Sequence, residues 1–163
     1  MDDTDSEILR LLEENCRTPI PELSIMLGIG EEEVRRRIKV LEDEKVIRKY
    51  AAVVDREKAG TSVVAAIIEL KVSPERDYGY DRIAERISRF PQVRSLRLVT
   101  GTYDLQLLVT GKNMQEVSRF VSEHIAPMDR IRETATIIIM KTYKENGNMY
   151  FEKPEGERLP FSF

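Results

Sequence analysis

Residues 21–46 have the sequence PELSIMLGIGEEEVRRRIKVLEDEKV, which contains two helical patterns on either side of a glycine-containing turn. Gly28 follows the first pattern, at the point where a left-handed residue commonly ends a helix. The second pattern buries a stripe at spacing i, i+4 and i+7, formed by Val34, Ile38 and Leu41. We therefore expect two helices, over 21–27 and 31–45.

Another helical pattern precedes this stretch. Residues 4–15 begin with a capping-box sequence, in which the Thr4 hydroxyl accepts from the Glu7 backbone N–H. Residues 46–54 follow the last helix as an extended segment, which we interpret as a wing. Three helices with a glycine turn before the third are typical of a helix-turn-helix. The sequence thus predicts a winged helix-turn-helix domain over 1–54, whose third helix would lie in the major groove of double-stranded DNA.

Basic residues lie on the outward face of the third predicted helix and in the expected wing. On the helix they lie opposite or beside the buried stripe, and in the wing they are placed to reach phosphates. The predicted DNA-contacting residues are Arg35, Arg36, Lys39, Arg48 and Lys49. The alternative is a helix that simply exposes its charges to solvent, but the complete pattern of three helices and a wing favours DNA binding.

The net charge of −3, from 26 basic and 29 acidic residues, conceals an uneven distribution. Residues 1–33 carry two basic and ten acidic side chains, a net charge of −8. Residues 34–60 carry nine basic and five acidic side chains, a net charge of +4, and residues 61–163 carry a net charge of +1. The basic block coincides with the predicted recognition helix and wing, so the overall charge does not exclude nucleic acid as a partner.

Residues 61–144 alternate between strand and helix patterns, after a linker over 55–60. The order β-α-β-β-α-β predicts a ferredoxin-like fold, so the whole chain is expected to be an α+β protein. Such a sheet carries both helices on one face, and we expect a second subunit to bury the other face. The expected elements are strand 61–72, helix 80–90, strands 93–100 and 103–109, helix 114–125 and strand 131–143.

A tail over residues 145–163 follows the last predicted strand. It contains aromatic residues, among them Tyr150, Phe161 and Phe163, in which a disordered tail is normally poor. We expect part of the tail to lie as an arm over a neighbouring subunit. The alternative is an unstructured end.

Five motifs together resemble the Lrp/AsnC family of feast/famine regulators, over about residues 3–144. They are DSEILRLLEENCR (5–17), PELSIMLGI (21–29), EEVRRRIKVLEDEKVIRKYAAVVD (32–55), VTGTYDLQLLV (99–109) and IRETATIIIM (131–140). The resemblance implies a DNA-binding transcriptional regulator that forms homodimers through its ferredoxin-like domains, commonly assembled into octamers. It also implies regulation by an amino acid or another small metabolite bound between dimers.

The resemblance places the effector near the turn of the second hairpin, in the VTGTYD motif. A glycine there lets the backbone approach a ligand closely, and Asp104 can hold an ammonium group. The expected effector-binding residues are Gly101, Thr102, Tyr103 and Asp104, with hydroxyls from Thr134 and Thr136 on the last strand. The alternative is a turn that only supports oligomer packing.

Two departures from the family pattern bear on DNA binding. Three glutamates open the third helix, where the family usually has Ser or Thr, and carboxylates there would repel phosphates. Ile25 and Met26 occupy positions of the second helix where the family carries basic residues, and they suggest a small contact patch for another helix-turn-helix domain. The alternative function is therefore a ligand-sensing or assembly protein with weak or lost DNA binding.

Other functions have less support in the sequence. Siroheme decarboxylases resemble this family and use histidine and arginine residues, but the one histidine here is His124, so we expect no enzymatic activity. With Cys16 as the one cysteine, no metal site and no cofactor are expected. The acidic N-terminus and the lack of a long apolar run predict a cytoplasmic protein with no membrane partner.

Overall fold

The computed structural model describes residues 1–61 and 63–150, which fall into two compact units. The first comprises Met1–Val53 and the second begins at Val54. Within the described residues, no helix is both long and apolar enough to cross a membrane. The predicted tail arm lies mostly outside the described residues; its described part contains β5 (Lys144–Glu145) and β6 (Asn148–Met149), a short antiparallel pair.

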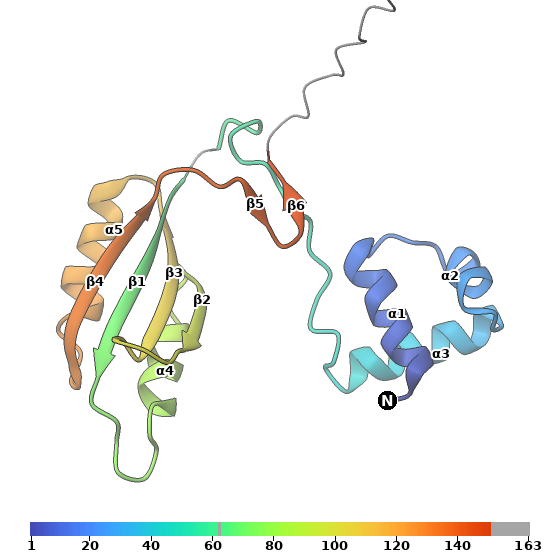
Figure 1. Cartoon of the computed structure of the whole chain (residues 1–163), viewed down its shortest axis with the longest axis horizontal. Coiled ribbons are helices and arrows are strands. Elements are labelled where there is room, and N and C mark those ends of the chain that lie inside the picture. Colours follow the sequence, from blue (N-terminus) through green and yellow to red (C-terminus); the bar gives the residue numbers. More distant parts are fainter. Residues whose placement is uncertain (62, 151–163) are drawn as a thin grey trace, which may run out of the picture. The chain divides into compact units, whose positions relative to one another are not determined.

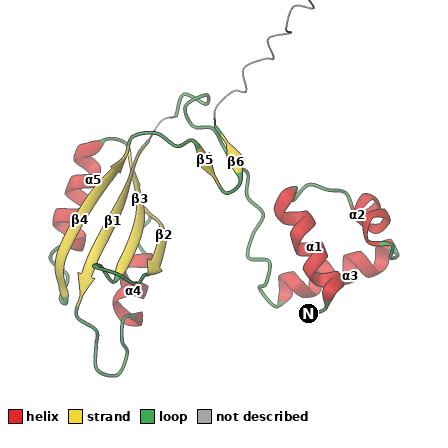
Figure 2. Cartoon of the chain, viewed as in Figure 1, coloured by secondary structure: helices red, strands yellow, loops and turns green. Residues whose placement is uncertain are grey.

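The first unit is helical (Figure 2). It contains α1 (Asp3–Glu14), α2 (Ile20–Leu27) and α3 (Glu31–Asp43), close to the three predicted helices. Its core is built from the apolar positions of the three patterns, namely Ile8, Leu11, Leu12, Leu23, Val34 and Leu41. Gly28 has φ +66° and ends α2 in the left-handed conformation, which confirms the turn expected from the sequence.

The capping box of α1 differs from the predicted one. Asp2, not Thr4, is the N-cap: its Oδ1 accepts from the Asp5 backbone N–H at 2.9 Å, and Asp5 Oδ2 accepts from the Asp2 N–H at 3.0 Å. Glu7 is therefore free to pair along the helix with Arg10, at 2.6 Å. The Thr4–Glu7 box was wrong because Asp2 offers an equally good cap sequence two residues earlier.

The expected wing is also wrong. Residues 46–54 contain no strand and have no strand partner among the described residues. The chain leaves α3 through Lys45, which has φ +59°, and the Ile47 N–H donates to the Leu41 carbonyl. The Tyr50 hydroxyl then donates to Glu42 at 2.8 Å. A wing requires a second strand to pair with, and the first part of this segment is instead hydrogen-bonded to the end of α3.

The second unit has the predicted β-α-β-β-α-β order (Figure 1). Its four-stranded antiparallel sheet has strand order β2-β3-β1-β4, as in a ferredoxin-like fold. The second helix of the unit continues for a turn as the π-helix η1. The elements are β1 (Val64–Val72), α4 (Asp81–Ser88), β2 (Val93–Leu98), β3 (Leu105–Gly111), α5 (Met114–Phe120), η1 (Val121–Ile125) and β4 (Ile131–Ile139).

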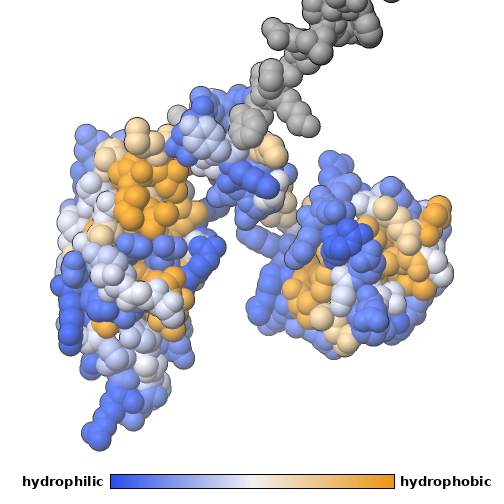
Figure 3. Space-filling model, viewed as in Figure 1, coloured by the Kyte–Doolittle hydropathy of each residue, from blue (hydrophilic) through white to orange (hydrophobic). Residues whose placement is uncertain are grey.

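Both helices cover one face of the sheet, as Figure 1 shows. Alternate residues of β1 and β3 are buried beneath them, among them Ile68 and Leu107. The residues between these face the opposite side, which we term the open face. Its apolar end contains Ile67, Leu108 and Ile137, and Ile137 is 49% exposed. Apolar side chains gather on this side of the sheet in Figure 3.

Candidate functional site

The basic residues predicted on α3 are exposed. The side chains of Arg35, Arg36 and Lys39 are 55%, 63% and 74% accessible, whereas Val34 and Leu41 on the same helix are buried. The helix therefore presents a polar face to solvent, as the 3.6-residue pattern indicates. This face is the one that a recognition helix would place in the major groove.

Each of these three basic side chains is paired with a carboxylate of α3 itself. Arg35 lies 3.5 Å from Glu31 and 3.7 Å from Glu32, and Lys39 lies 3.5 Å from Asp43. Arg36 is held more tightly, with Nη2 and Nε at 2.7 and 2.8 Å from the two oxygens of Glu33. The three glutamates that open the helix thus act as intrahelical partners of its arginines, in addition to their favourable position at the helix N-terminus.

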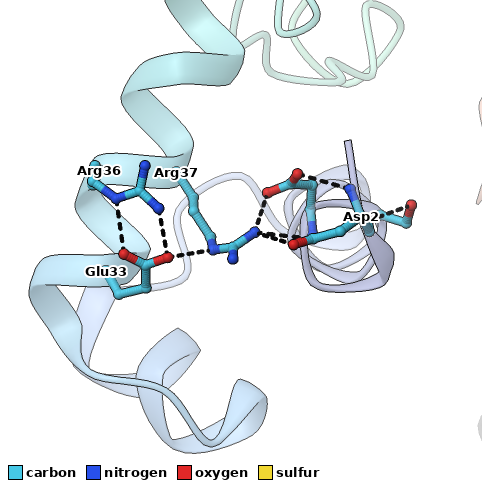
Figure 4. A network of polar contacts seen from close by, with 6 residues as sticks. Asp2, Glu33, Arg36 and Arg37 are labelled. Carbon is cyan, nitrogen blue, oxygen red and sulfur yellow. Dashed lines mark hydrogen bonds and ion pairs between the residues drawn. The ribbon is translucent and has the colours of Figure 1, made fainter.

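Arg37 forms a contact between two helices that the sequence analysis did not identify. Its side chain is 20% accessible and joins α3 to the start of α1, donating to Asp2 and Asp5 at 2.8 Å and to Glu33 at 2.7 Å (Figure 4). The hydrogen bonds from Arg36 and Arg37 lower the pKa of Glu33 to about 2. Two features of the sequence could have indicated these contacts. Arg37 follows Glu33 by four residues, and acidic residues are concentrated at the N-terminus.

Arg48 and Lys49 lie in the irregular segment that replaces the expected wing. Both are exposed, and neither forms a hydrogen bond or ion pair with any other residue that the structure describes. Both side chains remain available to an anionic partner. No strand pairing among the described residues fixes the position of the segment that carries them.

The VTGTYD turn is tied to the end of β1. Gly101 has φ +133°, which L side chains rarely adopt, so the turn requires glycine at this position. The Asp104 carboxylate accepts from the Val72 backbone N–H at 2.8 Å, and Lys71 and the Tyr80 hydroxyl each lie 3.4 Å from its other oxygen. The Val72 N–H, followed by Lys71, lowers the pKa of Asp104.

Tyr103, in the same turn, reaches the polar end of the open face. Its hydroxyl donates to Glu133 of β4 at 3.1 Å, and that contact raises the pKa of Tyr103. Glu133 pairs in register with Lys71, next to Glu69, whose Oε1 accepts from Gln106 at 3.4 Å. The turn therefore borders a surface that offers carboxylates and an ammonium group to a zwitterionic ligand.

Thr134 and Thr136 do not lie on this surface. They pair in register with Leu70 and Ile68, whose side chains are buried beneath the helices, so both hydroxyls belong to the other side of β4. Gly101 and Thr102 are exposed in the turn itself. Of the six expected effector residues, the structure brings together the four of the turn, with Glu133 as a neighbour that the sequence analysis missed.

His124 lies in η1 and packs with two aromatic rings. Its ring centroid is 5.5 Å from that of Phe90 and 5.9 Å from that of Phe120. No cluster of His, Cys, Asp and Glu suited to a metal ion occurs among the described residues. His124 is therefore an exposed residue whose ring lies against two aromatic side chains.

Comparisons with known proteins agree with this architecture. Residues 1–42 match the AsnC-type helix-turn-helix domain, and residues 65–149 match the Lrp/AsnC ligand binding domain. The chain is 40% identical to the uncharacterized HTH-type transcriptional regulator YugG of Bacillus subtilis, over 97% of this chain and 96% of the relative. It is 38% identical to the uncharacterized HTH-type transcriptional regulator PH0140 of Pyrococcus horikoshii, over 88% and 89%.

A solved structure shows the same fold with a ligand. The L-Met complex of the transcriptional regulator NMB0573 from Neisseria meningitidis superposes with a TM-score of 0.70 at 28% identity, over 89% of this chain and 93% of that one. A helix-turn-helix unit linked to a ligand-binding ferredoxin-like unit defines a transcriptional regulator. The chain belongs to the Lrp/AsnC family of such regulators. The comparisons give no support to the siroheme decarboxylase alternative, and the names of the relatives are those of regulators.

Proposed function

We propose that the protein binds double-stranded DNA through α3, with Arg36, Lys39 and Arg35 at the bases and Arg48 and Lys49 at phosphates. The observation that carries the proposal is the exposed face of α3, which presents Arg35, Arg36 and Lys39 opposite a stripe in which Val34 and Leu41 are buried. The carboxylates on the same helix reduce the general attraction to DNA, so selectivity has to come from base contacts. We also propose a cytoplasmic location, which is consistent with a regulator of this family that binds DNA.

The proposed effector is an amino acid bound beside the VTGTYD turn. Glu69, Glu133 and Lys71 there present both signs of charge, and the related Neisseria regulator binds L-Met. The proposed assembly is a homodimer through the open face of the sheet, with dimers joining into an octamer. Effector binding between dimers would then act by shifting the assembly equilibrium and the spacing of the helix-turn-helix units.

A mobility-shift titration tests the DNA interface, using an operator selected from a random duplex pool. Arg36→Ala combined with Lys39→Ala should weaken operator binding at least tenfold, because each phosphate or base contact contributes about 1–3 kcal/mol, and binding should fall steeply with salt. The matched control is Arg89→Ala with Arg119→Ala, which removes two charges from exposed helical ion pairs of the other unit. The same titrations with each common amino acid test the effector, which should change operator affinity in the wild-type protein.

A second function is favoured by the pairing of every outward arginine of α3 with a glutamate. In that case the chain is a ligand-sensing or assembly protein that has lost DNA binding. Failure of the wild-type protein to enrich any sequence from the random pool at low salt, with the oligomer intact, would establish this function instead.

A further inference from the structure

The recognition helix carries its own counterions. Residues Glu31–Asp43 contain five acidic and four basic side chains, a net charge of −1 on the element expected to meet a polyanion. A basic residue that already has a carboxylate partner gains less from a phosphate than a free one, because it must first give up that partner. The arrangement of the carboxylates therefore decides how much affinity DNA phosphates can provide.

Glu33 differs from the two glutamates that precede it. Glu31 and Glu32 share Arg35 at 3.5 and 3.7 Å, and Glu32 is 96% accessible. Glu33 instead holds Arg36 through both oxygens, and one of these also accepts from Arg37 at 2.7 Å. Figure 4 shows Glu33 between the two guanidinium groups, with Arg37 extending to Asp2.

Arg37 keeps Glu33 in place. Its other contacts are the carboxylates of Asp2, the N-cap of α1, and of Asp5 on α1. If Arg37 moved toward solvent together with Glu33, these ion pairs to α1 would break. When Arg36 leaves Glu33 to contact DNA, the Glu33 carboxylate stays beside the interface. A phosphate is then repelled by that carboxylate, whereas a guanine edge is uncharged and takes both donors of an arginine through O6 and N7.

We propose that Glu33 is a specificity-determining residue, which competes with DNA phosphates for Arg36 and thereby suppresses non-specific DNA binding. This inference rests on the proposed function of α3 as the recognition helix. The glutamates at the start of α3 would then contribute to selectivity between operator and non-specific DNA. At the operator, hydrogen bonds from Arg36 to a base would replace both of the hydrogen bonds that Arg36 donates to Glu33.

The test is Glu33→Gln in the full-length chain, titrated by fluorescence anisotropy against the selected operator and a scrambled duplex. Affinity for the scrambled duplex should rise about fivefold, the effect of one added phosphate contact of roughly 1 kcal/mol. The slope of log K against log salt should steepen by about 0.9, as expected for one more phosphate neutralised. Affinity for the operator should rise less, so the ratio of specific to non-specific binding falls.

Two controls separate this role from a change in net charge or folding. Glu32→Gln removes the same charge one residue earlier without touching Arg36, and should raise non-specific affinity clearly less. In a background carrying Arg36→Gln, the substitution of Glu33 should no longer change the affinity ratio, because the residue through which it acts is gone. Glu33→Gln leaves Asp2 and Asp5 in place as partners of Arg37, and the melting temperature of the variant reports whether the fold is kept.

The outcomes distinguish this inference from the proposed function. If the wild-type protein selects an operator but Glu33→Gln and Glu32→Gln behave alike, or if the effect persists without Arg36, the role of Glu33 is refuted while DNA binding stands. If the wild-type protein selects no operator, the proposed function fails. Loss of specificity in Glu33→Gln alone supports the inference.

Discussion

At Asp104 the backbone and the side chain join the hairpin turn to the neighbouring strand. The backbone N–H donates to the Leu70 carbonyl at 2.9 Å, and the carboxylate accepts from the Val72 N–H at 2.8 Å. The sequence predicts this carboxylate as a partner for an effector ammonium group. In the structure it already satisfies a backbone donor at the end of β1, so it also fixes the position of the turn.

Asp104→Ala should lower the free energy of unfolding by about 1 kcal/mol, because the Val72 N–H loses its acceptor. Asp104→Asn is the matched variant, since its amide oxygen can still accept that bond. We expect it to retain most of the stability in a urea titration of the full chain. An alanine variant as stable as the wild-type protein would show that water replaces the carboxylate without cost.

Among the elements, those with strong hydrophobic periodicity were predicted well. The three helices of the first unit and the six main elements of the second lie near the predicted residues, because a buried stripe requires a regular spacing whatever covers it. The wing was not predictable in this way: residues 46–54 have the composition of a strand but no partner to pair with. The Arg37 network joins residues 32 and 35 positions apart, so local spacing alone could not reveal it.

The contact between α1 and α3 should depend on pH. The hydrogen bonds of Arg36 and then Arg37 lower the pKa of Glu33 from its ordinary 4.5 to about 2, and the Asp5 N–H and Arg37 lower that of Asp2. A lowered pKa stabilises the folded state fully above the unfolded value of 4.5, and this stabilisation is lost as the pH falls toward 2. The melting temperature should therefore fall over this range.

Scanning calorimetry of wild-type protein and Glu33→Gln isolates the contribution of this carboxylate. The wild-type protein should melt higher above pH 4.5, and the difference should shrink as the pH falls toward 2. Glu32→Gln serves as the control, because its carboxylate lies 3.7 Å from Arg35 and contacts neither Arg36 nor Arg37. If the melting temperatures of the wild-type protein and Glu33→Gln differ as much near pH 2 as above pH 4.5, this account is contradicted.

For the whole molecule, the open face of the sheet bears on whether the chain is a monomer or a dimer. The two helices cover one face of the sheet. On the other face, apolar residues of three strands remain accessible, including Ile67, Leu108 and Ile137. A sheet normally buries such a surface against another layer, and the described part of this unit supplies none. A dimer through this face would also bring two recognition helices into one assembly, as a palindromic operator requires.

Ile137→Asp should shift the assembly toward monomers, because each copy would bury a charged residue in the apolar end of the open face. Sedimentation velocity at several concentrations measures this shift, and circular dichroism confirms that the fold is kept. Met114→Asp is the matched control: Met114 is 47% exposed at the start of α5, on the helix side of the sheet, and its substitution should leave the dimer intact. Operator binding should weaken in Ile137→Asp even though α3 is unchanged, since one helix-turn-helix unit then binds without its partner. A variant that remains dimeric would place the subunit interface elsewhere on the chain.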